Sequence, residues 1–347
     1  MHSATDRSEA LRRFVAATLG DDQNFTLAPA SADASFRSYW RVRAGTQSWI
    51  VMNAPPDTEN LAPWLDIDQR LRAAGVNAPD VLAEDRDQGF LLLADLGTRT
   101  YLPELNAANV DASRVDKLYA DAFDALLHMQ TGVDARGLPD YDRARLVAEM
   151  ELLPEWFLTR HLGFVPNCEE WDIIEATFTR LTNAALEQPQ RFVHRDYHSR
   201  NLMIVPENNP GVIDFQDAVI GPITYDLVSL LRDCYVEWPS ARVDAWVEQY
   251  RRRLISTGVT DADSAQFRRW FDLMGLQRHL KVLGIFCRLW YRDGKVGYLA
   301  DLPLTLRYAL SVARAYAEFA EFTALLERAV AGRNITHPRE DAAVATP

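Results

Sequence analysis

The segment FVHRDYHSRNLMIVPENNPGVIDFQDAVIGPITYDL, residues 192–227, is the part of the chain richest in side chains suited to catalysis. It holds two histidines and four aspartates, separated by short apolar runs. Short apolar runs between polar residues are typical of buried strands joined by loops. Because loops on a rigid scaffold commonly carry catalytic residues, we expect the functional site here.

The order of the polar residues in this segment is that of a phosphoryl-transfer site. His194, Arg195 and Asp196 are followed by Asn201, and Asp214 ends a later apolar run. Kinases place H-R-D-x-x-x-x-N and then a metal-binding aspartate in this order. One aspartate accepts the hydroxyl proton, while a carboxylate and an amide oxygen hold Mg²⁺ against the phosphates. We therefore predict Asp196 as the base, with Asn201 and Asp214 as magnesium ligands.

The other polar residues of the segment are expected to support this site. His198 either touches phosphate or substrate or braces the loop, and His194 is assigned to structural support. Asp217, three residues after Asp214, is expected behind the metal ligands. Asp226 opens an apolar helix, so we expect it to cap that helix and to brace the catalytic loop.

The residues before this segment predict a small β-rich lobe. An amphipathic helix is expected over 8–19, and a second helix over 58–74 starts at an Asp57-Thr58 cap. Period-two patterns predict strands at 36–43, 48–53, 81–83 and 90–94. We expect these strands to form a small, mostly antiparallel sheet.

The rest of the chain predicts a larger, mainly helical lobe. Apolar residues recur at helical spacing in 115–127, 143–161 and 169–187, and again up to about residue 330. Short strands are expected only at 191–194, 202–205 and 211–215. The turn residues Asn208-Asn209-Pro210-Gly211 predict a hairpin between the last two of these strands, which would bring Asn201 and Asp214 side by side. The predicted class is α+β and bilobal, with lobes at 1–94 and 95–332, a hinge near 92–97 and a disordered tail at 333–347.

Composition restricts the possible partners. The chain has 347 residues and a formal net charge of −12, which argues against nucleic acid or an anionic membrane as partner. Its three cysteines are far apart and predict neither a metal site nor a disulfide framework. Neither a secretory signal nor a spanning apolar stretch is evident, so we expect a cytoplasmic protein without an obligate protein partner.

HRDYHSRN, IDFQD and GPITYDL together resemble the aminoglycoside phosphotransferase family of small-molecule kinases, over roughly residues 8–330. ASADASFRSYWRV, MNAPPDTEN, FLLLADLG and ELLPEWFLTRHLG are similar to the family's N-acetylmuramate and N-acetylglucosamine kinases. The resemblance implies a protein-kinase-like fold and the use of ATP with Mg²⁺. It also implies an α-1-phosphate product made at the anomeric hydroxyl, in bacterial peptidoglycan recycling.

The resemblance also implies positions for the nucleotide. The hinge whose backbone meets adenine would be Leu92, Leu93, Ala94 and Asp95. The loop over the phosphates would be residues 33–38, with Ser35, Phe36, Arg37 and Ser38.

This chain departs from the kinase pattern in two ways. The phosphate loop lacks G-x-G-x-x-G, and Met52 or Asn53 stands where kinases keep a phosphate-anchoring lysine. Our hypothesis is that Arg37 supplies the missing positive charge.

A local excess of basic residues near the C-terminal end predicts an acceptor site. Residues 278–308 hold six basic residues against two acids, and Lys281, Arg288 and Arg292 share one helical stripe. A solvated helix face would also explain this stripe. We predict Arg288 and Arg292 as binding residues for an anionic amino sugar. A second set, on one helix face, is Glu151, Trp156 and Arg160.

Other functions remain compatible with these patterns. The acceptor hydroxyl could belong to an aminoglycoside, a choline-like molecule or an amino acid. The missing lysine also suggests a nucleotide-binding pseudokinase, against which the intact Asp196, Asn201 and Asp214 argue. A protein kinase is disfavoured because no A-P-E-like segment follows IDFQD.

Overall fold

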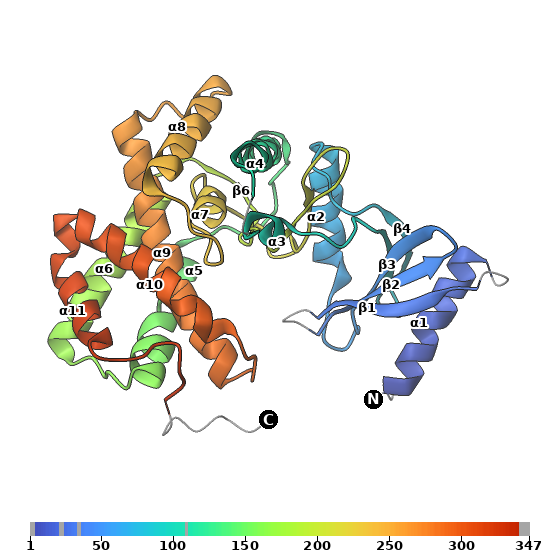
Figure 1. The fold of residues 1–347 in the computed structure, drawn as a ribbon, viewed down its shortest axis with the longest axis horizontal. Coiled ribbons are helices and arrows are strands. Elements are labelled where there is room, and N and C mark those ends of the chain that lie inside the picture. The colour runs from blue at the N-terminus through green and yellow to red at the C-terminus, as the bar shows by residue number, and fades with distance from the viewer. Residues whose placement is uncertain (1–3, 21–23, 33–35, 108–109, 340–347) are drawn as a thin grey trace.

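The computed structural model describes residues 4–20, 24–32, 36–107 and 110–339. The chain forms an N-terminal lobe around an antiparallel sheet and a larger helical lobe, as Figure 1 shows. The predicted α+β class and two-lobe arrangement are confirmed. Within the described residues, no helix is long and apolar enough to cross a membrane.

The N-terminal lobe contains one five-stranded sheet with the strand order β1-β2-β3-β5-β4. Its first strand was not predicted, because the sequence TLAPASA includes a proline and has little apolar alternation. An edge strand tolerates that proline, and a register shift at Pro29 marks the irregularity. The strands are β1 (Thr26–Ala32), β2 (Ser38–Ala44), β3 (Gln47–Asn53), β4 (Val81–Asp85) and β5 (Phe90–Ala94).

The two faces of this sheet are covered by two helices, α1 (Ala4–Leu19) and α2 (Leu61–Ala73). Val51 and its neighbours on one face pack against α1, while Met52 belongs to the cluster that includes α2. This follows from the two-residue alternation of a strand. The cap of α2 is Asn60, whose side chain accepts from the Ala62 N–H, so the predicted Asp57-Thr58 cap was wrong.

The helical lobe is organised around α9 (Ser264–Tyr291), which is largely buried and contacts most of the other helices of the lobe. Such an enclosed helix is apolar around much of its circumference. The other helices of this lobe are α3 (Tyr101–Leu105), α4 (Ala112–Gly132), α5 (Arg143–Met150), η1 (Leu153–His161), α6 (Cys168–Leu186), α7 (Tyr225–Leu231), α8 (Ser240–Ser256), η2 (Tyr298–Asp301), α10 (Leu302–Ala315), η3 (Ala317–Phe319) and α11 (Ala320–Val330).

The segment 192–227 lies on short strands in this lobe. β6 (Gln190–Val193) pairs with β9 (Val219–Pro222), and β7 (Leu202–Met203) pairs with β8 (Gly211–Val212). The predicted hairpin between 202–205 and 211–215 is therefore confirmed, with shorter strands.

Two expectations for this lobe were wrong. The single helix predicted over 143–161 is divided into α5 and the π-helix η1, at the point where Pro154 lacks a backbone N–H. The expected disordered tail does not hold for residues 333–339. There the Ile335 carbonyl lies 2.9 Å from His161 Nε2, and the Arg339 N–H donates to the Tyr291 hydroxyl at 2.9 Å.

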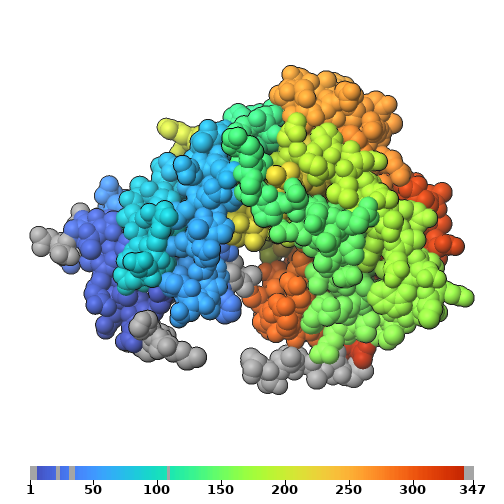
Figure 2. Space-filling model, turned by 180° about the vertical axis from the view of Figure 1, so that it is seen from behind, coloured from blue at the N-terminus to red at the C-terminus, as the bar shows by residue number. Residues whose placement is uncertain are grey.

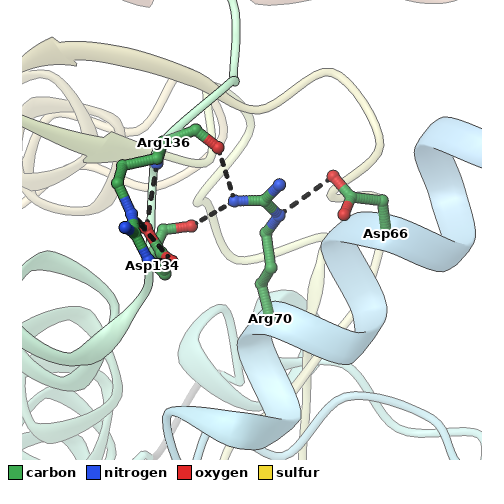
Figure 3. A network of polar contacts seen from close by, with 4 residues as sticks. All are labelled: Asp66, Arg70, Asp134 and Arg136. Atoms are coloured by element: carbon green, nitrogen blue, oxygen red, sulfur yellow. Dashed lines mark hydrogen bonds and ion pairs between the residues drawn. The ribbon is translucent and has the colours of Figure 1, made fainter.

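Helix α2 joins the two lobes. Trp64 on α2 packs against Phe215 of the catalytic segment, with ring centroids 5.0 Å apart. On the same helix Arg70 binds Asp66 at 2.9 Å and donates to the carbonyls of Asp134 and Arg136, which follow α4 (Figure 3). The N-terminal lobe is thus tied to the helical lobe by apolar and by charged contacts.

We expect Arg70→Met to lower the free energy of unfolding by about 1–3 kcal/mol, because it removes charge-assisted hydrogen bonds to two backbone carbonyls. Urea unfolding followed by circular dichroism measures this change. Arg86→Met is the matched control, since exposed Arg86 pairs only with Glu84 two residues away and should cost less than about 0.5 kcal/mol. Equal losses in the two variants would contradict the bridging role of Arg70.

Candidate active site

A cavity of about 680 Å³ lies between the lobes and is lined by both. Figure 2 shows the hollow from behind, between the blue N-terminal lobe and the green and orange helical lobe. The cavity brings together the predicted Asp196, Asn201, Asp214 and His198. Of the predicted hinge residues, Leu93, Ala94 and Asp95 line it, whereas Leu92 points into the cluster that packs on α1.

The catalytic loop is held by one buried carboxylate. Asp226, with 0% exposure, accepts the backbone N–H of His194 at 2.7 Å and of Arg195 at 3.0 Å. Burial raises the pKa of Asp226 to about 7, although these two hydrogen bonds act to lower it. Arg195 has a φ of 78°, a left-handed backbone that costs a non-glycine residue energy. The carboxylate therefore supports a turn that local preference disfavours.

His194 connects this loop to the strand that precedes Asp214. Its Nε2 lies 3.1 Å from the Ile213 carbonyl, which can only accept, so Nε2 carries the proton. Its Nδ1 accepts from the backbone N–H of Asp196 at 3.2 Å. Burial lowers the pKa of His194 to about 4, which keeps the ring neutral. A neutral imidazole thus links the backbone on both sides of the site.

Asp196 faces the cavity among positive groups. Burial acts to raise the pKa of Asp196, but the charges of His198, Lys281 and Arg195 outweigh it and hold that pKa below its usual value. The carboxylate is therefore ionised at neutral pH, as a base must be. His198 Nδ1 is buried without a hydrogen-bond partner, and its ring packs edge-on against Tyr235.

Asn201 and Asp214 lie side by side. The amide nitrogen of Asn201 is 3.3 Å from Asp214 Oδ2 and donates to the Asp196 carbonyl at 2.9 Å. Gln216 donates to the other oxygen, Asp214 Oδ1, at 2.9 Å. With Asn201 Nδ2 used in this way, its amide oxygen is the atom left to bind a cation. Asp217, predicted behind the metal ligands, is exposed, whereas its neighbour Gln216 donates a hydrogen bond to Asp214.

The donor set of this pair fits Mg²⁺ that arrives with a nucleotide. One carboxylate and one amide oxygen are hard ligands, and Mg²⁺ usually takes one or two carboxylates plus substrate phosphates and water. Across the described residues, His, Cys, Asp and Glu do not gather into any group of three or more that could hold a metal alone. The remaining ligands would therefore come from phosphate oxygens and water.

A buried charge network that the sequence did not reveal lies behind Asp196. Glu149 pairs with Arg195 and, at 3.0 Å, with Lys281 Nζ. Lys281 also donates to the Tyr225 hydroxyl at 3.0 Å, and the Tyr141 hydroxyl donates to Glu149. The sequence pattern pointed to Lys281, which belongs to the basic stripe of residues 278–308. No sequence pattern distinguishes Glu149 from the other acidic residues of the chain.

The expected phosphate loop differs from the structure. Ser38 Oγ accepts from Asn53 at 3.1 Å and lines a pocket on the α1 side of the sheet, away from the cleft. The cleft is lined instead by Tyr39 and Arg41 of the same strand. The alternation of a strand explains this one-residue difference, because neighbouring residues face opposite ways.

Phe36 and Arg37, the other described residues of that loop, do not line the cavity either. The Phe36 side chain is 72% exposed, and Arg37 Nε lies 4.0 Å from Glu59. Ser35 lies outside the described residues. The hypothesis that Arg37 replaces the kinase lysine therefore has no support from the geometry.

Of the six residues predicted to bind substrate, only His198 lines the cavity. The cavity is not lined by Glu151, Trp156, Arg160, Arg288 or Arg292. Leu289 still lines the cavity, so Arg288, one residue earlier on α9, faces another side of the helix. Arg292 follows the last residue of α9 that lines the cavity. Helix α9 supplies the wall with Arg278, Lys281, Val282, Ile285, Phe286 and Leu289.

Comparison with known proteins agrees with this geometry. A family described as "Phosphotransferase enzyme family" matches residues 26–268. An N-acetylmuramate/N-acetylglucosamine kinase of Pseudomonas putida is 46% identical over 312 residues, covering 88% of this chain and 89% of the relative. The kinase of the same name from Neisseria meningitidis is 41% identical and covers 89% and 92%.

Solved structures show the same fold at low sequence identity. The ADP-bound aminoglycoside phosphotransferase APH(2'')-Ib matches with a TM-score of 0.59 and 14% identity, over 87% of this chain and 98% of that one. The choline kinase LicA of Streptococcus pneumoniae matches with a TM-score of 0.59 and 13% identity, over 87% and 99%. The family match extends over more than half of the length of this chain, so this chain belongs to the phosphotransferase enzyme family.

Proposed function

We propose that this chain transfers the γ-phosphoryl group of ATP to the anomeric hydroxyl of N-acetylmuramate or N-acetylglucosamine, giving the α-1-phosphate. The observation that carries the proposal is the convergence of ionised Asp196 with adjacent Asn201 and Asp214 in one interlobe cavity. The relatives named for these two sugars, 46% identical over most of the chain, support the choice of acceptor. We propose a role in cell-wall recycling on the same ground.

The nucleotide would occupy the part of the cavity beside the hinge. Apolar side chains from both lobes line that part, which suits a flat base. They are Ile50, Pro79, Leu93, Leu96, Met203 and Ile213. Arg41 pairs with Asp95 at 2.7 Å, and Asp95 also accepts from the Gly97 N–H at 2.9 Å. These contacts would fix the backbone that meets adenine.

Asp196 would accept the proton of the sugar hydroxyl as that oxygen attacks the γ-phosphorus. Asn201 and Asp214 would hold Mg²⁺, which when bound neutralises charge on the phosphate oxygens. Lys281, held by Glu149, keeps positive charge beside the base from the helical lobe. Positioning and charge compensation, rather than covalent chemistry, supply most of the acceleration in this class of reaction.

The acceptor half of the cavity suits a sugar better than a polycation. Tyr235, Phe286 and Tyr298 form an aromatic wall, with the Phe286 ring 6.2 Å from Tyr235 and 5.3 Å from Tyr298. Such rings commonly pack against the apolar face of a pyranose. Arg200, Arg278 and Lys281 line the same half and would repel a cationic aminoglycoside.

We expect Asp196→Asn to lower kcat by a factor on the order of 10²–10⁴, because an amide cannot accept the hydroxyl proton. Steady-state kinetics with N-acetylmuramate measures kcat, and calorimetry should find ATP binding retained. Near-normal turnover in this variant would reject Asp196 as the base.

We expect Asp214→Ala to abolish magnesium-dependent ATP binding, because it removes the charged ligand of the cation. Isothermal titration with and without Mg²⁺ measures the effect. Asp217→Ala is the matched control: it removes an exposed carboxylate three residues away and should leave the affinity unchanged. The metal assignment fails if both variants bind ATP alike.

The acceptor is tested with a panel of N-acetylmuramate, N-acetylglucosamine, kanamycin and choline, each with Mg²⁺ and ATP. We expect turnover with the two amino sugars and a phosphorus NMR doublet coupled to the anomeric proton. Turnover confined to kanamycin or choline, or phosphate on another hydroxyl, would refute the proposed acceptor or position.

A further inference from the structure

Four side chains with a permanent positive charge line the cavity, and they differ in their partners. Arg41 pairs with Asp95 at 2.7 Å, Lys281 with Glu149 at 3.0 Å and Arg200 with Asp301 at 3.8 Å. Arg278, on α9, is the exception. No carboxylate in the described part of the chain lies within 4.0 Å of its nitrogens.

Arg278 is buried without the partners that a guanidinium usually has. It is 4% exposed, its Nη1 reaches the Cys234 thiol at 3.6 Å, and its Nε has no hydrogen-bond partner. A thiol is a weak acceptor, whereas a guanidinium offers five N–H donors. A buried charge is costly unless it is paired and hydrogen-bonded. An anion in the cavity would complete this site.

The acidic residue next to Cys234 does not fill that need. Asp233 is buried beside Cys234, but its two oxygens accept the backbone N–H groups of Ser199 and Tyr235, each at 3.0 Å. It therefore offsets the charge of Arg278 from a distance while it shapes the loop around Asn201. Arg278 thus lines the cavity without a carboxylate partner from the described part of the chain.

The surroundings of Arg278 restrict the kind of anion. Val282, Ile285 and Leu289 follow on the same face of α9 and also line the cavity. An apolar strip next to a buried guanidinium suits a carboxylate on a short alkyl group. Of the two proposed acceptors, only N-acetylmuramate has one, in its lactyl ether.

We propose that Arg278 is a specificity residue that binds the lactyl carboxylate of N-acetylmuramate through charge-assisted hydrogen bonds. This inference rests on the proposed function and adds how one site distinguishes its two sugars. N-acetylglucosamine lacks the carboxylate, so Arg278 contributes to the use of one acceptor and not of the other.

The test compares kcat/KM for both sugars in Arg278→Met. We expect a loss of at least about tenfold for N-acetylmuramate, mainly through KM, from the lost charged hydrogen bond. For N-acetylglucosamine we expect a change within about threefold. Arg278→Lys, which keeps the charge but not the planar fork, should recover part of the loss. Arg269→Met is the control, because Arg269 lies on the same helix and pairs with Glu318 away from the cavity.

A second arm changes the substrate and not the protein. The methyl ester of N-acetylmuramate has no carboxylate, so the unaltered enzyme should lose about the same factor with it. In Arg278→Met, kcat/KM for the acid and for the ester should differ by less than about threefold. The two changes, one in the protein and one in the substrate, together form a double-mutant cycle. If the variant does not fold, equal kcat/KM for acid and ester with the unaltered enzyme overturns the proposal, and a tenfold preference for the acid supports a carboxylate site.

The experiments give different results if the inference about Arg278 fails and if the proposed function fails. Equal losses for both sugars in Arg278→Met would assign Arg278 to the phosphoryl group or to folding, and would overturn the inference while leaving the kinase intact. An unaltered enzyme that phosphorylates neither sugar would instead refute the proposed function.

Discussion

The architecture of the site depends on the carboxylate of Asp226 and the two backbone N–H groups that it accepts. These bonds, at 2.7 and 3.0 Å, hold His194 and the left-handed Arg195, and so direct the side chain of Asp196 into the cavity. The neutral ring of His194 then connects the Asp196 backbone to Ile213, one residue before Asp214. The backbone of Asp196 is thereby coupled through hydrogen bonds to the strand that leads to Asp214.

The positive charges beside Asp196 come from residues of the helical lobe. Kinases usually anchor phosphate with a lysine of the N-terminal sheet, but here that strand position holds the buried Met52. Lys281 on α9 lies beside Asp196 and is fixed by Glu149, which also holds Arg195. A change in the position of Glu149 would thus disturb two cations next to the base. Lys281 lies on the largely buried helix α9, whereas Glu149 lies on α5 and Arg195 follows β6.

Several features could be predicted because they depend on neighbours in sequence. The order of Asp196, Asn201 and Asp214 indicated phosphoryl transfer, and the turn around Pro210 indicated the hairpin that brings the last two together. The phosphate loop and the acceptor residues could not be placed in this way. On β2 a difference of one residue decides whether Ser38 or Tyr39 faces the cleft, and the structure places Tyr39 there. A basic stripe along a long helix does not reveal which of its residues face the cavity.

The sequence by itself determined the reaction class, the two-lobe fold and the convergence of Asp196, Asn201 and Asp214 in one cavity, because spacing within one loop and hairpin constrains their geometry. Only the tertiary structure decided which cations face the cavity and which are already neutralised. Arg41, Arg200, Arg278 and Lys281 are indistinguishable as charges in a sequence, yet three have carboxylate partners within 4.0 Å that come from distant parts of the chain. Whether a charged side chain has a partner depends on the tertiary structure, because the interaction energy of two charges is set by their distance and by their burial.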